Sequence, residues 1–309
     1  MNETLFPQDL RQTLGLDYPL LMLDNLALDR EARNAIGRKA ISIADSVFAG
    51  HFPGMPILPG VLQVAGMAQA ATALGQSLFP EKGRLALVGL ERVKFRKPVL
   101  PGHVLQTSVT FQQEREDGIL EFQASVSHND GQASAGTILL APRDEDWFRP
   151  QYQETWTSPL AEQFPADRTD ATGLEKLLPH RRPFLLIDGA CGMTDTAANQ
   201  IFGFKNLSGT DILLQASADF SFPGYLHPEI AAQLGCAYLL QQPDNQGKTG
   251  IFLSIDKAVF HHPVFAGEQL QLKVTCLHSG RAGSGEAVIY SGQRLVTETC
   301  LKFLFVEKI

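Results

Sequence analysis

The sequence predicts an α+β fold made of two similar units in tandem. A segment that begins at Tyr18-Pro19 recurs 164 residues later at Arg182-Pro183, and Phe95 with its following Pro-Val recurs at Phe260. Internal repetition of this kind decides the architecture before any other feature does. Each unit also has one long apolar stretch of helical type, and several other segments alternate apolar and polar residues. This alternation is typical of antiparallel strands with one buried face.

The elements follow in order along the chain. Residues 61–78 form the helix expected in the first unit and residues 229–240 the helix expected in the second, while residues 120–127 and 270–275 show the period-two pattern of strands. Residues 141–170 are polar, punctuated by prolines and without periodicity, which indicates a linker.

We therefore divide the chain into an N-terminal unit at residues 1–142, a linker at 143–170 and a C-terminal unit at 171–309. The linker contains four large aromatic residues, from which we expect part of it to pack against the two units; they are Trp147, Phe148, Tyr152 and Trp156.

Composition limits the classes of function. A chain of 309 residues, 44% of them hydrophobic, can bury two sizeable cores. Its net charge of −7 argues against nucleic acid and anionic membrane surfaces as partners. No apolar run approaches the roughly 18 residues of a membrane span, and the first residues lack a signal-peptide pattern, so we expect a cytoplasmic protein. The four cysteines form no C-x-x-C pair, which favours buried thiols over a zinc site or disulfides.

A histidine on a rigid loop is the strongest functional signal. His51 opens the segment His-Phe-Pro-Gly-Met-Pro-Ile-Leu-Pro-Gly-Val. Its three prolines fix φ, and its two glycines allow the tight turns between them. The segment reaches Pro59-Gly60 at the start of the first predicted helix, where free N–H groups and the positive end of the helix dipole are available. We expect His51 to be a general base beside an oxyanion site at the N–H of Gly60, with Pro59 and Gly54 supporting the loop.

Residues 50–69 and 87–102 resemble a known enzyme family. The first segment is similar to the signature HFPG-x-P-x-x-PGVL-x-x-E-A-M-A-Q of the bacterial β-hydroxyacyl-acyl carrier protein dehydratases, and the second to their G-I-D-x-x-R-F-K-R-P-V-x-P-G-D strand and turn. The resemblance covers most of residues 18–111. It departs from the family at one important position, because Ala65 stands where the family has its catalytic glutamate, fourteen residues after the histidine.

The second unit contains the missing carboxylate. Residues 177–188 resemble the opening of the same dehydratases, and the repeat places Glu229 opposite Ala65. It also places Gln233 opposite Gln69, so that Gln233 is a candidate to support the carboxylate.

The second unit has lost the histidine. Its Phe222-Pro223-Gly224 matches part of the first loop, and the residue before it is Ser221; counting from Lys205 instead places Ser217 opposite His51. His227 lies close enough in sequence to Glu229 to be considered for the same site.

The resemblance implies the fold and the site. The family has the hotdog fold, with a bent antiparallel sheet around a central helix, and its site lies between two units, with the histidine from one and the carboxylate from the other. A fused pair then implies a double hotdog, an intramolecular pseudo-dimer with one composite site made by His51 and Glu229. The dehydratase domains of polyketide synthases look the same in this respect. Further oligomerisation stays open.

The resemblance also implies the reaction, a reversible conversion of (3R)-hydroxyacyl thioesters to trans-2-enoyl thioesters in fatty acid or polyketide biosynthesis. His51 suits removal of the C2 proton because an imidazole with an ordinary pKa near 6.5 is available in its neutral form. We expect burial to keep Glu229 partly protonated, so that it donates to the departing hydroxyl. Whether one residue or both move the protons stays open. No metal and no organic cofactor is expected.

The expected partner is acyl carrier protein with its phosphopantetheine-linked substrate. Arg92, Lys94 and Arg96 alternate along one strand with Lys97 adjacent, and they are candidates to contact the phosphate or the acidic carrier. The cluster His180-Arg181-Arg182 is a second candidate for the same role.

Two alternatives stay open. One is a catalytically silent acyl-binding or scaffold protein, because each unit has lost half of the catalytic residues. The other is a hotdog acyl thioesterase, which is less well supported because those enzymes activate water with a carboxylate. A separation of His51 and Glu229 beyond about 8 Å would favour the scaffold, since a positioned acid and base must reach one substrate.

Overall fold

One antiparallel sheet runs through the whole molecule. The computed structural model describes residues 2–151, 157–194 and 199–307. Within these residues, 14 strands form a single sheet in the order β1-β2-β3-β5-β6-β7-β4-β11-β14-β13-β12-β10-β9-β8. The strands are β1 (Asn2–Leu5), β2 (Asn25–Asp29), β3 (Asn34–Ala40), β4 (Leu85–Phe95), β5 (Val104–Glu114), β6 (Leu120–His128), β7 (Gly131–Pro142), β8 (Arg168–Asp170), β9 (Gly189–Cys191), β10 (Gln200–Asn206), β11 (Lys248–Phe260), β12 (Gln269–Ser279), β13 (Ala282–Ser291) and β14 (Arg294–Glu307).

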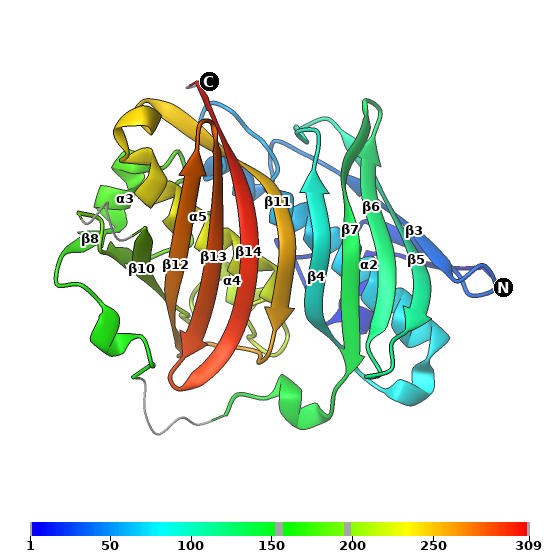
Figure 1. Ribbon diagram of the computed structural model, residues 1–309. Coiled ribbons are helices and arrows are strands. Elements are labelled where there is room, and N and C mark those ends of the chain that lie inside the picture. Colours follow the sequence, from blue (N-terminus) through cyan, green and yellow to red (C-terminus); the bar gives the residue numbers. More distant parts are fainter. Residues whose placement is uncertain (1, 152–156, 195–198, 308–309) are drawn as a thin grey trace.

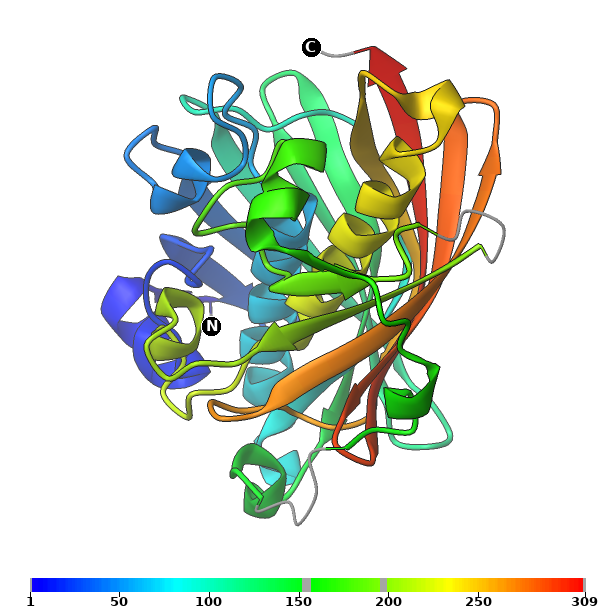
Figure 2. The ribbon, with the colours of Figure 1, turned by 90° about the vertical axis from the view of Figure 1, so that its left-hand side faces the viewer.

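Two long helices lie inside the curve of this sheet, one behind each half (Figures 1 and 2). They are α2 (Gly60–Leu78) and α5 (His227–Leu240). The shorter helices are α1 (Pro7–Leu14), α3 (Ala171–Leu177) and α4 (Ile212–Gln215), and single turns of 3-10 helix are η1 (Ser46–Ala49), η2 (Pro80–Lys82), η3 (Glu145–Phe148), η4 (Ala161–Gln163), η5 (Gly224–Leu226) and η6 (Pro243–Asn245).

The two halves of the sheet repeat the same order of strands. In the first half the order is β3-β5-β6-β7-β4, and in the second half it is β10-β12-β13-β14-β11. The halves meet where β4 pairs with β11, from Lys94 opposite Ser254 to Gly89 opposite Val259. Figure 1 shows these two strands side by side in the middle of the sheet. The double hotdog predicted from the sequence is confirmed.

Both central helices are almost wholly buried, which explains their apolar composition. Fourteen of the 19 residues of α2 and all 14 residues of α5 are buried. Pro59 caps α2 and Pro228 lies in the first turn of α5, where proline's fixed φ suits a helix start and its missing N–H costs nothing. Each helix packs against its own half of the sheet. The buried apolar residues of the two halves form one continuous hydrophobic core. Among the described residues, no helix combines the length and apolarity needed to cross a membrane.

Part of the predicted linker packs against both halves. Phe148 lies under the guanidinium of Arg84, 3.7 Å from its carbon to the ring centre. The ring of Trp147 stacks on that of His262, with centres 6.0 Å apart. This first part of the linker therefore covers the junction between the halves, as its aromatic residues predicted.

The end of the predicted linker belongs to the sheet. Residues 168–170 form β8, which pairs with β9. Tyr152 and Trp156, for which packing was also predicted, lie outside the described residues.

Candidate active site

The loop that carries His51 is closed by its own hydrogen bonds. The N–H of His51 donates to the carbonyl of Val47 in η1, and the N–H of Ile57 donates back to the carbonyl of His51. The imidazole Nδ1 lies 2.7 Å from the carbonyl oxygen of Ile57. A carbonyl oxygen only accepts, so Nδ1 carries the proton and Nε2 is left with a free lone pair. The ring of Phe52 stacks on the imidazole at 3.9 Å and fixes its plane.

Glu229 lies in the first turn of α5 and is buried. Its Oε1 accepts a hydrogen bond of 2.9 Å from Nε2 of Gln233, one helical turn later. Gln233 is held in turn by the backbone, because its Oε1 accepts from the N–H of Leu186 and its Nε2 also donates to the carbonyl of Phe184. Gln233 therefore holds the carboxylate by a hydrogen bond, and its supporting role in catalysis stays a prediction.

His180 is a third member of the site that the sequence did not identify. It lies between α3 and β9, is buried, and places Nε2 3.4 Å from Oε1 of Glu229. Its ring meets that of His51 edge to face, with centres 5.3 Å apart. The N–H of Arg181 donates to the carbonyl of Gly50, which ties this segment to the His51 loop.

This position corrects the prediction for the cluster at residues 180–182. His180 faces the carboxylate instead of a carrier protein, while Arg182 stays 89% exposed. The repeat could not point to His180, because the residue 164 positions before it is Leu16 and not a second histidine.

Burial and the neighbouring groups set the charges. Burial, followed by the proximity of His180, lowers the pKa of His51 from 6.5 to about 4, so its imidazole is neutral at pH 7. Burial alone raises the pKa of Glu229, but the hydrogen bond and charge of His180, the charge of His51 and the hydrogen bond from Gln233 outweigh it and hold that pKa below the ordinary value. The expectation of a partly protonated Glu229 is therefore wrong, because burial was visible in the sequence and the partners were not.

A cavity of about 360 Å³ opens in front of these three residues. Apart from them it is lined mainly by apolar side chains from the His51 loop, α5, β11 and β14, including Leu58, Ala232, Cys236, Phe252 and Phe303. Its shape and lining fit an acyl chain whose polar end lies at the histidines.

Gly60 lines the same cavity as the first residue of α2. A Cβ on Gly60 would lie only 2.8 Å from the ring of Phe95, so only glycine fits under this ring. Since the first N–H groups of a helix have no partner within the helix, the N–H of Gly60 is available to a ligand.

The remaining predicted residues fall into two groups. Arg96 and Lys97 line the cavity, and Arg96 also lines a surface hollow over β4, β6 and β7 that holds Arg92 and Lys94. Gly54 is an exposed turn residue with φ of 81°, a value that glycine adopts without strain.

The ligand atoms of His51, His180 and Glu229 lie within 4.8 Å of one another, a spacing that also suits a metal ion. His51 and Glu229 are therefore much closer than the roughly 8 Å beyond which they could not both reach one substrate. A second such group, His103, His128 and Asp130, lies outside the cavity.

The other half of the molecule contains the equivalent position without these groups. The N–H of Arg181 donates to the carbonyl of Gly50, and in the same way the N–H of Asp17 donates to that of Ala216. The residue opposite His51 is therefore Ser217, one position after Ala216.

The other two positions of the site have lost their polar groups as well. Leu16 stands opposite His180, and Ala65 stands opposite Glu229, both in register with the 164-residue repeat.

Backbone contacts also correct the match of Phe222-Pro223-Gly224. The N–H of Phe222 donates to the carbonyl of Val264, as the N–H of Leu58 donates to that of Val99. This segment is the counterpart of Leu58-Pro59-Gly60 at the helix start and not of the Phe-Pro-Gly after His51, because the second loop is two residues shorter. His227 lines the cavity of this second position and not that of Glu229.

Comparisons with known proteins bear on the family and the fold of this chain. Residues 28–137 match the family model of ApeI-like dehydratases. A 3-hydroxyacyl-[acyl-carrier-protein] dehydratase FabZ from Roseiflexus sp. (strain RS-1) is 37% identical over 139 residues, which cover 45% of this chain and 96% of that protein. The same enzyme from Erythrobacter litoralis is 42% identical over 111 residues, 35% of this chain and 74% of that protein.

Solved structures with a similar fold extend over nearly the whole chain. The dehydratase domain from the CurJ module of curacin polyketide synthase covers 93% of this chain and 96% of that domain, with a TM-score of 0.64 and 13% identity. The dehydratase domain of PpsC from Mycobacterium tuberculosis, solved in complex with C12:1-CoA, covers 94% and 99%, with a TM-score of 0.63 and 15% identity. From the sequence relatives, the chain belongs to the 3-hydroxyacyl-acyl carrier protein dehydratase family, here in the form of a double hotdog.

Proposed function

We propose that this chain is a hydro-lyase that dehydrates (3R)-3-hydroxyacyl thioesters to trans-2-enoyl thioesters at one composite active site. The observation that carries the proposal is that His51 from the first half and Glu229 from the second face one cavity, while their counterparts are Ser217 and Ala65. Each half alone lacks one of the two groups, and together they make one set.

The reaction follows from the charges of the resting site. Nε2 of neutral His51 takes the C2 proton, and the N–H of Gly60 stabilises the negative charge that develops on the thioester oxygen. The C2 electron pair then forms the C2–C3 double bond, and the C3–O bond breaks with its electrons moving to the hydroxyl oxygen. The proton on His51 passes to this oxygen, so that water leaves and the imidazole is neutral again.

Glu229 acts in this scheme as a carboxylate. It accepts a hydrogen bond from the 3-hydroxyl, which orients the C3–O bond, and its charge stabilises the imidazolium that forms on His51. His180 and Gln233 keep it ionised and in place. Among the described residues, this chemistry needs no group beyond those that line the cavity.

The substrate reaches the cavity on a carrier. Arg96 and Lys97 lie at the cavity that holds His51, and we assign to them the contact with the phosphopantetheine phosphate or the acidic surface of acyl carrier protein. Arg92 and Lys94 line a neighbouring hollow that shares Arg96, and they suit the outer rim of such an interface.

We propose residues 1–142 and 171–309 as the two units and residues 143–170 as the linker, whose last three residues add the edge strand β8 to the sheet. The cytoplasm is the compartment that we propose, because Cys191, Cys236, Cys276 and Cys300 are all free thiols, as expected in a reducing environment.

A panel of 3-hydroxyacyl thioesters on acyl carrier protein and on coenzyme A tests the proposal. We expect the (3R) isomers to lose water and form the conjugated enoyl thioester, with His51→Ala inactive as a control. Binding of these thioesters without water loss would favour the acyl-binding scaffold, and release of the free acid would favour a thioesterase.

A further inference from the structure

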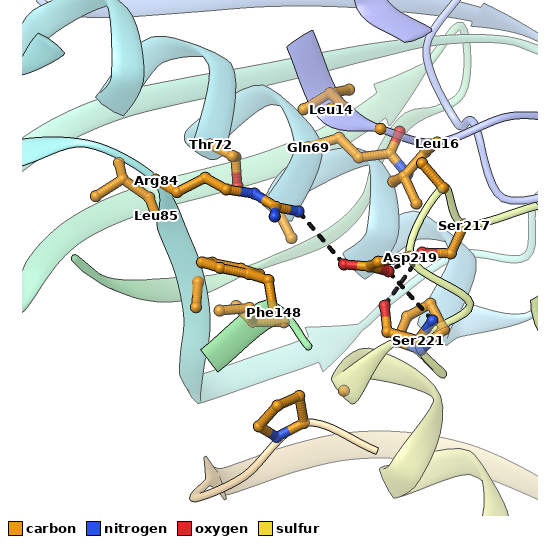
Figure 3. Close-up of a pocket in the computed structure, with 18 of the residues that line it drawn as sticks. Leu14, Leu16, Gln69, Thr72, Arg84, Leu85, Phe148, Ser217, Asp219 and Ser221 are labelled. Carbon is orange, nitrogen blue, oxygen red and sulfur yellow. Dashed lines mark hydrogen bonds and ion pairs between the residues drawn. The ribbon is translucent and has the colours of Figure 1, made fainter. Parts of the chain in front are cut away.

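A second cavity lies at the position where the catalytic residues have been lost. Its volume is about 490 Å³, larger than the 360 Å³ of the active-site cavity. Figure 3 shows it between α2, the start of β4 and the loop before α5. Leu14, Leu16, Leu85 and Phe148 form apolar parts of its wall (Figure 3).

Its walls are the counterparts of the active-site walls. Residues 85–87 of β4 line this cavity, and residues 250–252 of β11, which lie 165 positions later, line the other. Likewise Thr72 of α2 lines this cavity and Cys236, 164 positions later on α5, lines the other. The two cavities are therefore one site in two copies.

The turn that would hold a thioester carbonyl is preserved. The N–H of Leu226 donates to the carbonyl of Pro223 over 3.0 Å, as the N–H of Leu62 donates to that of Pro59 over the same distance. Gly224 lies under the ring of Phe260, where an added Cβ would come within 3.1 Å. This is the arrangement of Gly60 under its phenylalanine, with an N–H at the beginning of a helical segment.

The same wall holds a polar atom without a partner. His227 is 1% exposed and lines the cavity, and its Nδ1 lies 2.7 Å from Oγ1 of Thr297. Its Nε2 makes no hydrogen bond within the described parts of the chain. Buried polar atoms are nearly always paired, so this nitrogen is a candidate partner for a bound polar group.

Only the reacting groups are gone, and nothing large has replaced them. Ala65 and Ser217 are smaller than the glutamate and histidine opposite them. The hydroxyl of Ser217 donates to Asp219, which is also paired with Arg84 across the cavity at 3.3 Å (Figure 3). The space that these smaller side chains leave is therefore open to a ligand.

We propose that this second cavity binds an acyl thioester without turning it over, with the carbonyl at the N–H of Gly224 and the chain along Leu85 and Leu87. The choice of ligand rests on the function proposed for the first cavity. The existence of a second binding site does not rest on that function, because the number of ligands bound per chain can be measured without any catalysis.

The test is the number of ligands bound per chain. The probe is decanoyl-pantetheine, a thioester without a 3-hydroxyl, which the active site cannot dehydrate; its binding is measured by equilibrium dialysis and titration calorimetry. We expect two equivalents on the wild-type protein. Thr72→Phe fills the second cavity and Cys236→Phe, at the matched position, fills the first, and each is expected to bind one equivalent. The double variant is expected to bind none.

One equivalent on the wild-type protein, abolished by Cys236→Phe and unaffected by Thr72→Phe, would overturn the inference. Gln76→Phe, which also fills the second cavity, replaces Thr72→Phe if the latter shows an altered circular dichroism spectrum. Two bound equivalents on a protein without dehydratase activity would overturn the proposed function and leave the second site standing.

Discussion

His180 places its Nε2 atom 3.4 Å from Oε1 of Glu229, so the carboxylate on α5 is paired with an imidazole from a segment almost fifty residues earlier. The site therefore consists of three residues, His51, His180 and Glu229, and not of two. Because His180 is close to both His51 and Glu229, it lowers the pKa of each of them.

Replacing His180 is expected to change the pH dependence of catalysis as well as its rate. In His180→Phe, burial acts on Glu229 without the opposing imidazole, so the pKa of Glu229 rises. The pKa of His51 rises too, because His180 lowers it. We expect kcat to fall on the order of 10-fold or more and the acidic limb of kcat/KM to move to higher pH. A slower enzyme with the wild-type pH profile would reduce His180 to a packing role, and Arg182→Ala, on an exposed neighbour, is the control.

The wild-type pH profile is a prediction of its own. His51 must be neutral to take a proton, and its pKa is about 4. Activity is therefore expected to stay constant from about pH 7 down to about pH 5.5 and to fall only as the pH approaches the pKa of His51. Measurement of kcat/KM over this range checks it. A half-maximal point near pH 6.5, the value of an ordinary histidine, would show that His51 is not the buried base described here.

Stability is expected to fall with acid through His227. Burial lowers its pKa to about 3. Between pH 6.5 and 3, His227 is therefore protonated in the unfolded chain and neutral in the folded chain. The contribution of neutral His227 is complete above pH 6.5 and is lost as the pH decreases, by about 1.4 kcal/mol for each pH unit.

His227→Gln introduces the residue type found at the equivalent position, Gln63, and removes this pH-dependent contribution to the free energy of unfolding. Urea unfolding at pH 7 and pH 4.5 should show a smaller loss of unfolding free energy in the variant than in the wild-type protein. An equal loss in both would contradict the assignment.

The oxyanion donor is tested at Gly60. A valine there would push into the ring of Phe95, since even a Cβ comes within 2.8 Å, and would shift the turn. We expect Gly60→Val to lower kcat/KM on the order of 10²-fold while the far-ultraviolet spectrum is retained. Adding Phe95→Leu to Gly60→Val gives the valine room. If kcat/KM of this double variant stays low, the loss comes from the displaced N–H. If kcat/KM recovers fully, the loss comes from crowding alone.

Much of this site could be predicted from the sequence because the repeat aligns the halves without any structure. The pairing of His51 with Glu229 follows from the family arrangement and from the repeat, which places Glu229 opposite Ala65. His180 escaped because its basic neighbours, Arg181 and Arg182, are typical of an exposed surface.

Two further features depend on contacts that a sequence does not contain. The charge of Glu229 is decided by partners from α5 and from the segment before β9, which only the fold brings together. The shortening of the second loop by two residues left Ser217 and Ser221 both open, and the backbone contact of Ala216 with Asp17 decides between them.

The central claim is that His51 and Glu229 form one catalytic unit across the two halves. A double-mutant cycle in kcat/KM on a (3R)-3-hydroxyacyl-acyl carrier protein measures this directly. His51→Ala and Glu229→Gln are each expected to cost on the order of 10²–10⁴, and the double variant about as much as the worse single variant, because both changes disable the same step. A double variant whose loss equals the product of the two single losses, or a Glu229→Gln enzyme with wild-type turnover, would contradict the composite site.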